Sequence, residues 1–135
     1  MPLVSRRDTL AIAAVIDIAI NARSRPVAAK ALAARHKLPP RHLEPVLQAL
    51  VREGILKGVR GPHGGYALAR EQKRITAEDI LRAAGRGDDE NQTPPLSSLI
   101  DDVVRPALAD AERGFSAALR RISVEDLQRT AEKQK

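Results

Sequence analysis

The spacing of hydrophobic residues changes from helical to strand-like between positions 38 and 70. The first part carries an apolar stripe at i, i+4, i+7 and i+8, while the other faces of this helix are polar. The stripe consists of Leu43, Leu47, Leu50 and Val51. Gly54 is a natural residue to end the helix, and residues 55–60 and 66–70 then predict two short strands. The glycines within 61–65 permit a tight turn, so we expect a helix followed at once by a β-hairpin.

Two more helices are expected before this one. Ser5 and Asp8 have the spacing of a capping box, and the apolar run after them predicts a helix from about Arg6 to Ala22. Arg25-Pro26 then interrupts the chain, and residues 27–36 predict a short second helix. A tight turn joins it to the polar-faced helix, as in a helix-turn-helix unit, although any small helical bundle can contain such a pair.

Asp17 and Pro45 are unusual residues within these helices. Asp17 lies in an otherwise apolar helix, where we expect an edge residue or a cap for a neighbouring helix rather than a catalytic acid. Pro45 has no N–H for the helical hydrogen bond, and its ring clashes with the carbonyl of Arg41. We therefore expect a loose, shifted or 3₁₀-like first turn in the third helix.

The hairpin is followed by a short helix and then by a long one. Thr76 is the expected N-cap of a helix that ends at Gly85, and residues 86–95 read as a polar linker. Residues 96–122 then carry a broad apolar face. Its main members are Leu99, Ile100, Val103, Leu108, Phe115 and Leu119. A small domain cannot bury so long a stripe alone, so we assign it to dimerisation, with folding back onto the same chain as the alternative.

These elements predict a mainly α fold with a small two-stranded β wing. We expect a winged helix-turn-helix domain at residues 1–85, a linker at 86–95, a dimerisation helix at 96–122, and a short C-terminal helix and tail at 123–135. Pro106 is expected to kink or weaken the dimerisation helix.

Composition and charge narrow the function classes. Only Tyr66 and Phe115 are aromatic among 135 residues, so the core is aliphatic and thin, which favours burial against a second copy. Residues 1–87 carry 16 Lys and Arg against 7 Asp and Glu, whereas residues 88–135 carry 7 against 10. This basic part predicts a polyanionic partner, with a solvated basic surface as the alternative. No segment resembles a signal peptide or a membrane span, and we expect a cytoplasmic protein.

Catalytic and metal chemistry are disfavoured. The chain has no cysteine, no HExxH motif, no nucleophile motif and no evident carboxylate cluster, so we do not expect an enzyme. The glycine-rich turn lacks the Gly-Lys-Ser/Thr of a P-loop. His36, His42 and His63 form a metal site only if the hairpin and the helix ends converge, and we expect neither a metal nor a cofactor.

The segment LEPVLQALVREGILKGVRGPHGGYALAR, followed by ITAEDILRAAG, resembles the Rrf-type (IscR/NsrR/CymR-like) family of bacterial winged helix-turn-helix transcription regulators. The hairpin motif VRGPxGGYxLAR is the most specific part, and the late segment RRISVEDL also matches. The resemblance implies a homodimeric, sequence-specific DNA-binding regulator, a repressor on a near-palindromic operator. The alternative is a winged-helix module whose main partner is another protein.

By position, the resemblance also implies roles for single residues. The start of the third helix reads bases in the major groove, and the hairpin enters the minor groove. These roles fall on Pro39, Arg41, His42 and Glu44 in the helix, and on Arg60, Gly61, His63 and Gly64 in the hairpin, while Arg6 matches a basic residue near phosphate. The chemistry agrees, since arginine pairs with guanine and glutamate accepts from cytosine.

The chain departs from the family where cluster-binding members place three cysteines. Here that region is RGDDENQTPPLSS, which offers no thiolate, so the resemblance is to the clusterless branch without an iron-sulfur cluster. The signal is then a small-molecule effector, a protein partner, or absent.

Overall fold

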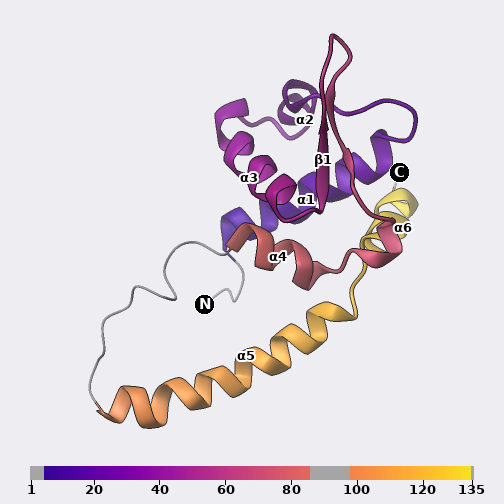
Figure 1. Ribbon diagram of the computed structural model, residues 1–135. Helices are drawn as coiled ribbons and strands as arrows, with labels where there is room; N and C mark the ends of the chain where they lie inside the picture. Colours follow the sequence, from indigo (N-terminus) through magenta and orange to yellow (C-terminus); the bar gives the residue numbers. More distant parts are fainter. Residues whose placement is uncertain (1–4, 86–97, 135) are drawn as a thin grey trace.

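The computed structural model describes residues 5–85 and 98–134. The elements in chain order are α1 (Arg6–Asn21), α2 (Ala29–Arg35), α3 (Pro40–Arg52), β1 (Leu56–Val59), β2 (Gly65–Leu68), a 3₁₀ turn (Gln72–Arg74), α4 (Ala77–Gly85), a π-helical turn (Ile100–Val104), α5 (Arg105–Arg120) and α6 (Val124–Lys133). Figure 1 shows a head formed by α1 to α4, the hairpin and α6, from which α5 projects. The expected mainly α fold with a two-stranded β wing is therefore confirmed. None of the described helices is long and apolar enough to cross a membrane.

The core of the head is aliphatic and centres on α1, which contacts α3, α4, α6 and β2. The largest fully buried side chains are Val15, Ile18, Leu32, Leu43, Leu47, Leu50, Ile55, Leu56, Ile75, Ile80 and Val124. Each such side chain stabilises the fold by about 1.5–3 kcal/mol. The predicted stripe of the third helix supplies three of them, and its fourth member, Val51, is half-buried.

The helix ends follow the expected local signals. Ser5 and Asp8 form the capping box of α1, because each side chain accepts a hydrogen bond from the other residue's backbone N–H. Thr76 does the same with Asp79 at α4. α3 ends before Gly54, whose φ of 75° places it in the left-handed region that glycine tolerates.

Two details of the helix-turn-helix differ from expectation. α2 begins at Ala29 rather than Val27, because Val27 pairs with Tyr66 of the hairpin through backbone hydrogen bonds of 2.9 and 2.8 Å. α3 continues without a break through Pro45. The expected 3₁₀ character is limited to the bond from His42 N to the Pro39 carbonyl, since a proline in the second turn removes only one helical hydrogen bond.

The long helix projects away from the head (Figure 1), so it does not fold back along its own chain. Leu99, Val103 and Leu108 are 66%, 58% and 57% exposed. Pro106 is accommodated by the π-helical turn that precedes it, and the helix ends at Arg120, before the predicted Ile122. The expected linker 86–95, residues 96 and 97, and the side chain of Ile100 lie outside the described residues.

The last helix returns to the head. Ser123 caps α6 together with Asp126, as the sequence suggests. Ser123 also pairs with Thr76, and Val124 donates its N–H to the Ile75 carbonyl at 2.8 Å. The Val124 side chain is fully buried in the core, so α6 completes the head.

Candidate nucleic-acid interface

The start of α3 presents polar side chains because its apolar residues are used in the core. Leu43 and Val46 are buried between α3 and its neighbours. The residues between them and before them, Pro39, Arg41, His42 and Glu44, are all exposed. Among the described residues, neither Arg41 nor Glu44 forms a salt bridge, so both are available to a partner.

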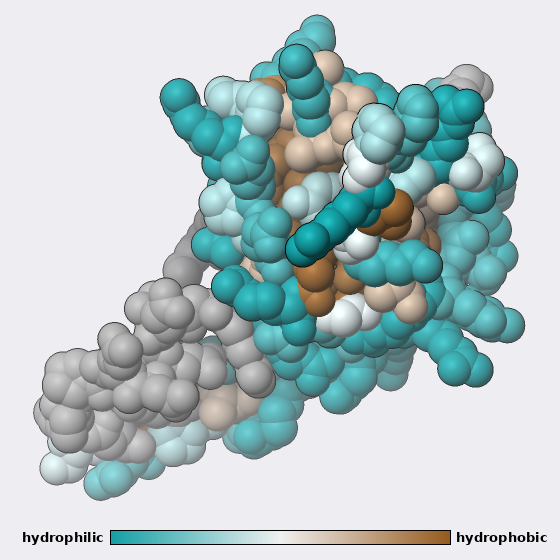
Figure 2. All heavy atoms as spheres, turned by 45° about the horizontal axis from the view of Figure 1, so that its top comes forward, coloured by the Kyte–Doolittle hydropathy of each residue, from teal (hydrophilic) through white to brown (hydrophobic). Residues whose placement is uncertain are grey.

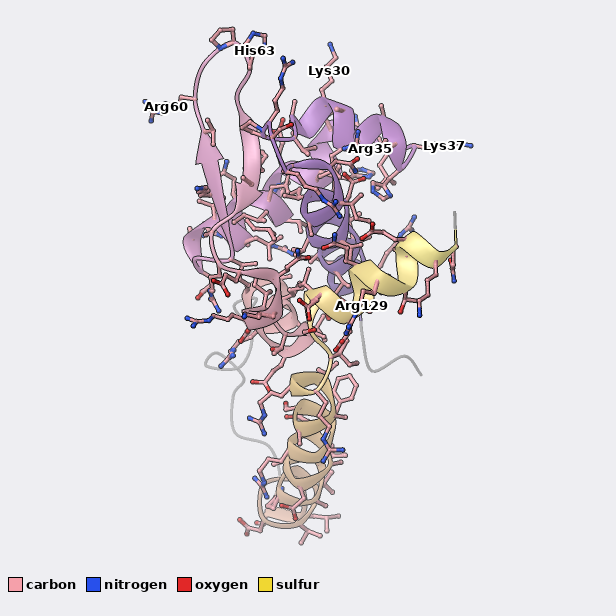
Figure 3. The ribbon with its side chains drawn as sticks, turned by 90° about the vertical axis from the view of Figure 1, so that its right-hand side faces the viewer. Lys30, Arg35, Lys37, Arg60, His63 and Arg129 are labelled. Carbon is pink, nitrogen blue, oxygen red and sulfur yellow. The ribbon has the colours of Figure 1, made fainter. Side chains whose placement is uncertain are left out.

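The hairpin places Arg60 and His63 at its free end. β1 and β2 are antiparallel with Val59 opposite Gly65, which leaves a short turn between them. A Cβ on Gly64 would lie 2.2 Å from the Val59 carbonyl oxygen, so this turn requires glycine. Gly61 has a φ of 116° and accepts a hydrogen bond from Gly64 N. Figure 3 shows both labelled side chains at the end of the hairpin, pointing away from the head.

The hairpin contacts the segment before α2 and the helix α3. The pairing of Val27 with Tyr66 joins it to the segment before α2. A Cβ on Gly65 would lie 2.4 Å from the Val27 carbonyl oxygen, so the strand can approach only because this residue is glycine. The Tyr66 hydroxyl accepts a hydrogen bond from Gln48 of α3 at 3.4 Å. The hairpin thus lies against α3 and against the segment before α2.

Hydrophobic atoms are also exposed near the hairpin. Figure 2 shows hydrophilic side chains around a smaller hydrophobic area on this side of the head. Val59 is 40% exposed in β1. Polar rather than apolar groups thus dominate the side that carries the hairpin.

Lys30 and Lys37 extend the basic surface beyond the residues predicted from the sequence. Figure 3 shows Lys30 beside the hairpin end and Lys37 at the turn after α2, with both side chains directed outward. Both residues are exposed. Their sequence signal is their place in and directly after the first helix of the helix-turn-helix, where phosphate contacts are common. Arg35, in the same helix, is instead directed to Asp17.

Asp17 connects α1 to the end of α2. Its carboxylate accepts hydrogen bonds from Arg35 at 2.6 and 2.9 Å and from Asn21 at 3.1 Å, and it lies 2.9 Å from His36 Nε2. Asp17 is 8% exposed, so the expectation of an edge residue is wrong, and it bonds side chains of α2 rather than capping its backbone. Burial by itself would raise the pKa of Asp17, but the hydrogen bonds from Arg35 and Asn21 and the charge of Arg35 outweigh it and lower the pKa.

Arg6 lies apart from the hairpin. It is exposed at the N-terminus of α1 and lines a groove together with Arg41 and His42. The structure therefore brings Arg6 together with the start of α3, while Arg60, Gly61, His63 and Gly64 form a second group at the hairpin.

Metal-ligating side chains do not gather in the part of the chain that is described. Within residues 5–85 and 98–134, no group of three or more His, Asp or Glu side chains is arranged to hold a metal ion. His63 lies at the hairpin, whereas His36 and His42 line the groove beside α1. Cysteine thiolates, which hold iron-sulfur clusters, are missing from the whole sequence.

A helix-turn-helix with an adjoining hairpin defines a winged helix-turn-helix protein, and the comparisons agree with this class. Residues 4–130 match the family model of Rrf2, described as an iron-dependent transcriptional regulator, and the chain belongs to this family of transcriptional regulators. The family resemblance found in the sequence is thereby confirmed.

Solved structures with the same fold cover nearly the whole chain. IscR from T. potens is 28% identical with a TM-score of 0.77, and the match covers 99% of this chain and 91% of that one. CymR, the global cysteine regulator of B. subtilis, is 25% identical with a TM-score of 0.73, covering 96% and 98%.

Sequence relatives match over a shorter region. The helix-turn-helix regulator BadM from Rhodopseudomonas palustris is 39% identical over 82 residues, which cover 60% of this chain and 52% of BadM. IscR from Cronobacter sakazakii is 30% identical over 79 residues, covering 58% and 49%. These matches thus span about half the length of the curated relatives.

Proposed function

We propose that the protein is a sequence-specific DNA-binding repressor that acts as a homodimer on a near-palindromic operator, without an iron-sulfur cluster. The observation that carries this proposal is the contact between the helix with the exposed polar start and the basic hairpin, made through Val27, Tyr66 and Gln48. A helix and a hairpin that lie side by side can enter a major groove and the adjacent minor groove together. Membership in a family of transcriptional regulators supports this use.

We assign the reading of bases to α3, and the contacts with DNA phosphates to the surrounding lysine and arginine side chains. Arg41 would pair with guanine, and Glu44 would accept a hydrogen bond from cytosine N4. His42 would form a weaker hydrogen bond to either base, and Pro39 would pack beside these residues. Arg60 would enter a narrow minor groove, where the negative potential attracts arginine. Gly61 and Gly64 keep the hairpin turn tight, so Arg60 and His63 can reach that groove. Lys30, Lys37 and Arg6 would contact phosphates, which positions the protein without reading sequence.

The exposed face of the long helix supports the homodimer. Leu99, Val103 and Leu108 are more than half exposed in the single chain, and a partner helix would remove them from water. Two heads joined in this way would read two half-sites, one helical turn of DNA or a small multiple apart. We assign repression on the family resemblance of the sequence alone.

The chemistry of the chain does not fit an iron-sulfur cluster. The family is described as iron-dependent, yet the sequence contains no cysteine to supply thiolates. A small-molecule effector or a protein partner would then supply the signal in place of a cluster.

The proposal is tested by selecting bound sequences from random duplex DNA at constant salt. Arg60→Ala should weaken binding by roughly 1–3 kcal/mol, lower the salt slope by about one, and relax preference at A·T flanks. Arg41→Ala should relax preference inside the half-site. Arg74→Ala is the matched control, because Arg74 is exposed in the 3₁₀ turn and pairs only loosely with Glu71 at 4.0 Å.

Different outcomes reject different parts of the proposal. No retention of wild-type protein on duplex DNA at low salt would reject DNA binding and favour a module for protein partners. Unchanged affinity and preference for Arg60→Ala would reject the wing assignment. An Arg41→Ala effect limited to affinity would reduce that residue to a phosphate contact.

A further inference from the structure

A groove of about 740 Å³ lies between the N-terminal halves of α1 and α3. Its volume is within the range of sites that hold small molecules, roughly 300–1,000 Å³. The apolar part of its lining comes from Leu10 and Ala13 of α1, from Leu38 in the turn before α3, and from Pro45 and Val46 of α3. All of these except the buried Val46 are at least partly exposed in the described structure.

The polar part of the lining is cationic. Arg6 and Arg7 enter from α1 and Arg41 from α3, and the remaining ionisable groups are His36 and His42. Within residues 5–85 and 98–134, no carboxylate lines the groove. Asp8, the nearest acidic residue along α1, is directed to the backbone N–H of Ser5 in the capping box. None of these guanidinium groups pairs with a carboxylate of the described residues, so they attract a negative charge.

Contacts with DNA would use only the polar part of the groove lining. Phosphates and base edges would use the guanidinium and imidazole groups, but they leave an apolar floor of leucine, alanine and proline without a matching surface. A compound with one negative charge and an apolar body satisfies both parts of the groove. The charge would pair with an arginine at the edge, and the body would cover the floor.

We propose that this groove binds a small organic anion with an apolar body, and that the bound anion competes with DNA for Arg41 and His42. The competition rests on the proposed function, because it requires those two side chains to contact the operator. Binding of the anion does not, since it depends on the groove alone. The ligand would act as an inducer that releases the protein from DNA.

The test uses the full-length protein and anilinonaphthalene sulfonate, a fluorescent aromatic anion, with uncharged phenylnaphthylamine as its neutral analogue. Ala13→Leu fills the floor of the groove without touching a proposed DNA contact. Ala69→Leu is the matched control, because Ala69 is exposed after β2 and lies outside the groove. Arg7→Gln removes one edge charge and leaves the floor intact.

Wild-type protein and Ala69→Leu should bind one sulfonate per chain and prefer it to the neutral analogue by about tenfold, equal to about 1.4 kcal/mol. Ala13→Leu should weaken binding of both probes by about tenfold or more, since the leucine occupies their space, while its DNA affinity stays within about twofold. Arg7→Gln should weaken only the sulfonate. Duplex DNA should displace the sulfonate from wild-type protein.

Other results overturn the inference. Sulfonate binding that persists in Ala13→Leu places the probe elsewhere, for example on the exposed face of α5. Equal binding of both probes removes the role of charge, and simultaneous binding of sulfonate and DNA removes the competition. Absence of DNA binding combined with groove-dependent sulfonate binding rejects the proposed function but keeps the anion site.

Discussion

Replacing Asp17 with asparagine should lower the free energy of unfolding by about 2 kcal/mol. The Asp17 side chain is 7% exposed and accepts two hydrogen bonds from Arg35, whose side chain is 42% exposed. A hydrogen bond to a charged group contributes about 1.5–3 kcal/mol, whereas an exposed ion pair contributes about 0–1 kcal/mol. The half-exposed Arg35 puts this pair in the lower part of the first range, at about 2 kcal/mol, because asparagine keeps one acceptor oxygen but loses the charge.

Urea denaturation at one protein concentration measures the effect, since dimerisation would make stability depend on concentration. Asp110→Asn is the control, because Asp110 pairs with Arg113 on the surface of α5 and both side chains are 71% exposed. That change should alter the unfolding free energy by about 0.5 kcal/mol or less. A cycle with Arg35→Gln should assign about 1–2 kcal/mol to the Asp17–Arg35 pair itself.

The pH dependence gives an independent test of the same pair. The folded protein lowers the pKa of Asp17 below its ordinary value of 3.8, so its stabilising contribution is complete above pH 3.8. It is lost as the pH falls through the lower folded-state pKa. The difference between wild type and Asp17→Asn should thus shrink as the pH falls below about 4. A difference no larger than that of Asp110→Asn, or one that does not shrink as the pH falls below 3.8, would refute the reasoning.

Three further predictions concern iron, assembly and the wing. Protein purified without oxygen should be colourless and bind DNA equally well with or without iron, and a stoichiometric iron-sulfur absorbance band would contradict the cysteine argument. Val103→Glu and Leu108→Glu should weaken both dimerisation, measured by sedimentation, and operator binding, measured by DNA titration. The control Arg113→Glu, in α5, should weaken neither. A wild-type monomer at micromolar concentration would contradict the dimer. Gly64→Ala should distort the hairpin and weaken DNA binding, because the new Cβ would lie 2.2 Å from the Val59 carbonyl oxygen. Gly58→Ala should leave DNA binding unchanged, because its Cβ would have no atom within 4 Å. Equal DNA binding by the two variants would contradict the steric argument.

Features coded by neighbouring residues were predictable from the sequence. The capping boxes at Ser5 and Thr76 depend on residues three positions apart, and the end of α3 depends on Gly54 alone. The hairpin follows from its glycine spacing. These elements therefore agree with expectation to within one or two residues.

Features that join distant residues were not predictable. Nothing local indicates that Asp17 meets Arg35, that Val27 pairs with Tyr66, or that Val124 enters the core. Each is made by packing of elements whose relative position the hydrophobic pattern does not specify. For the same reason the sequence predicted Arg41 and His42 as site residues but not the groove that they share with α1. Their roles toward DNA stay predictions.

The return of α6 changes how this protein can be divided. The chain leaves the head at Gly85 and re-enters it at Ser123, so the long helix is in effect an insertion within one folding unit. A fragment that stops at Gly85 lacks the buried Val124 and the strand-like pairing of Thr76 with Ser123. Truncation therefore removes part of the head together with the arm. Swapping the arm between relatives, from one junction to the other, leaves the head whole.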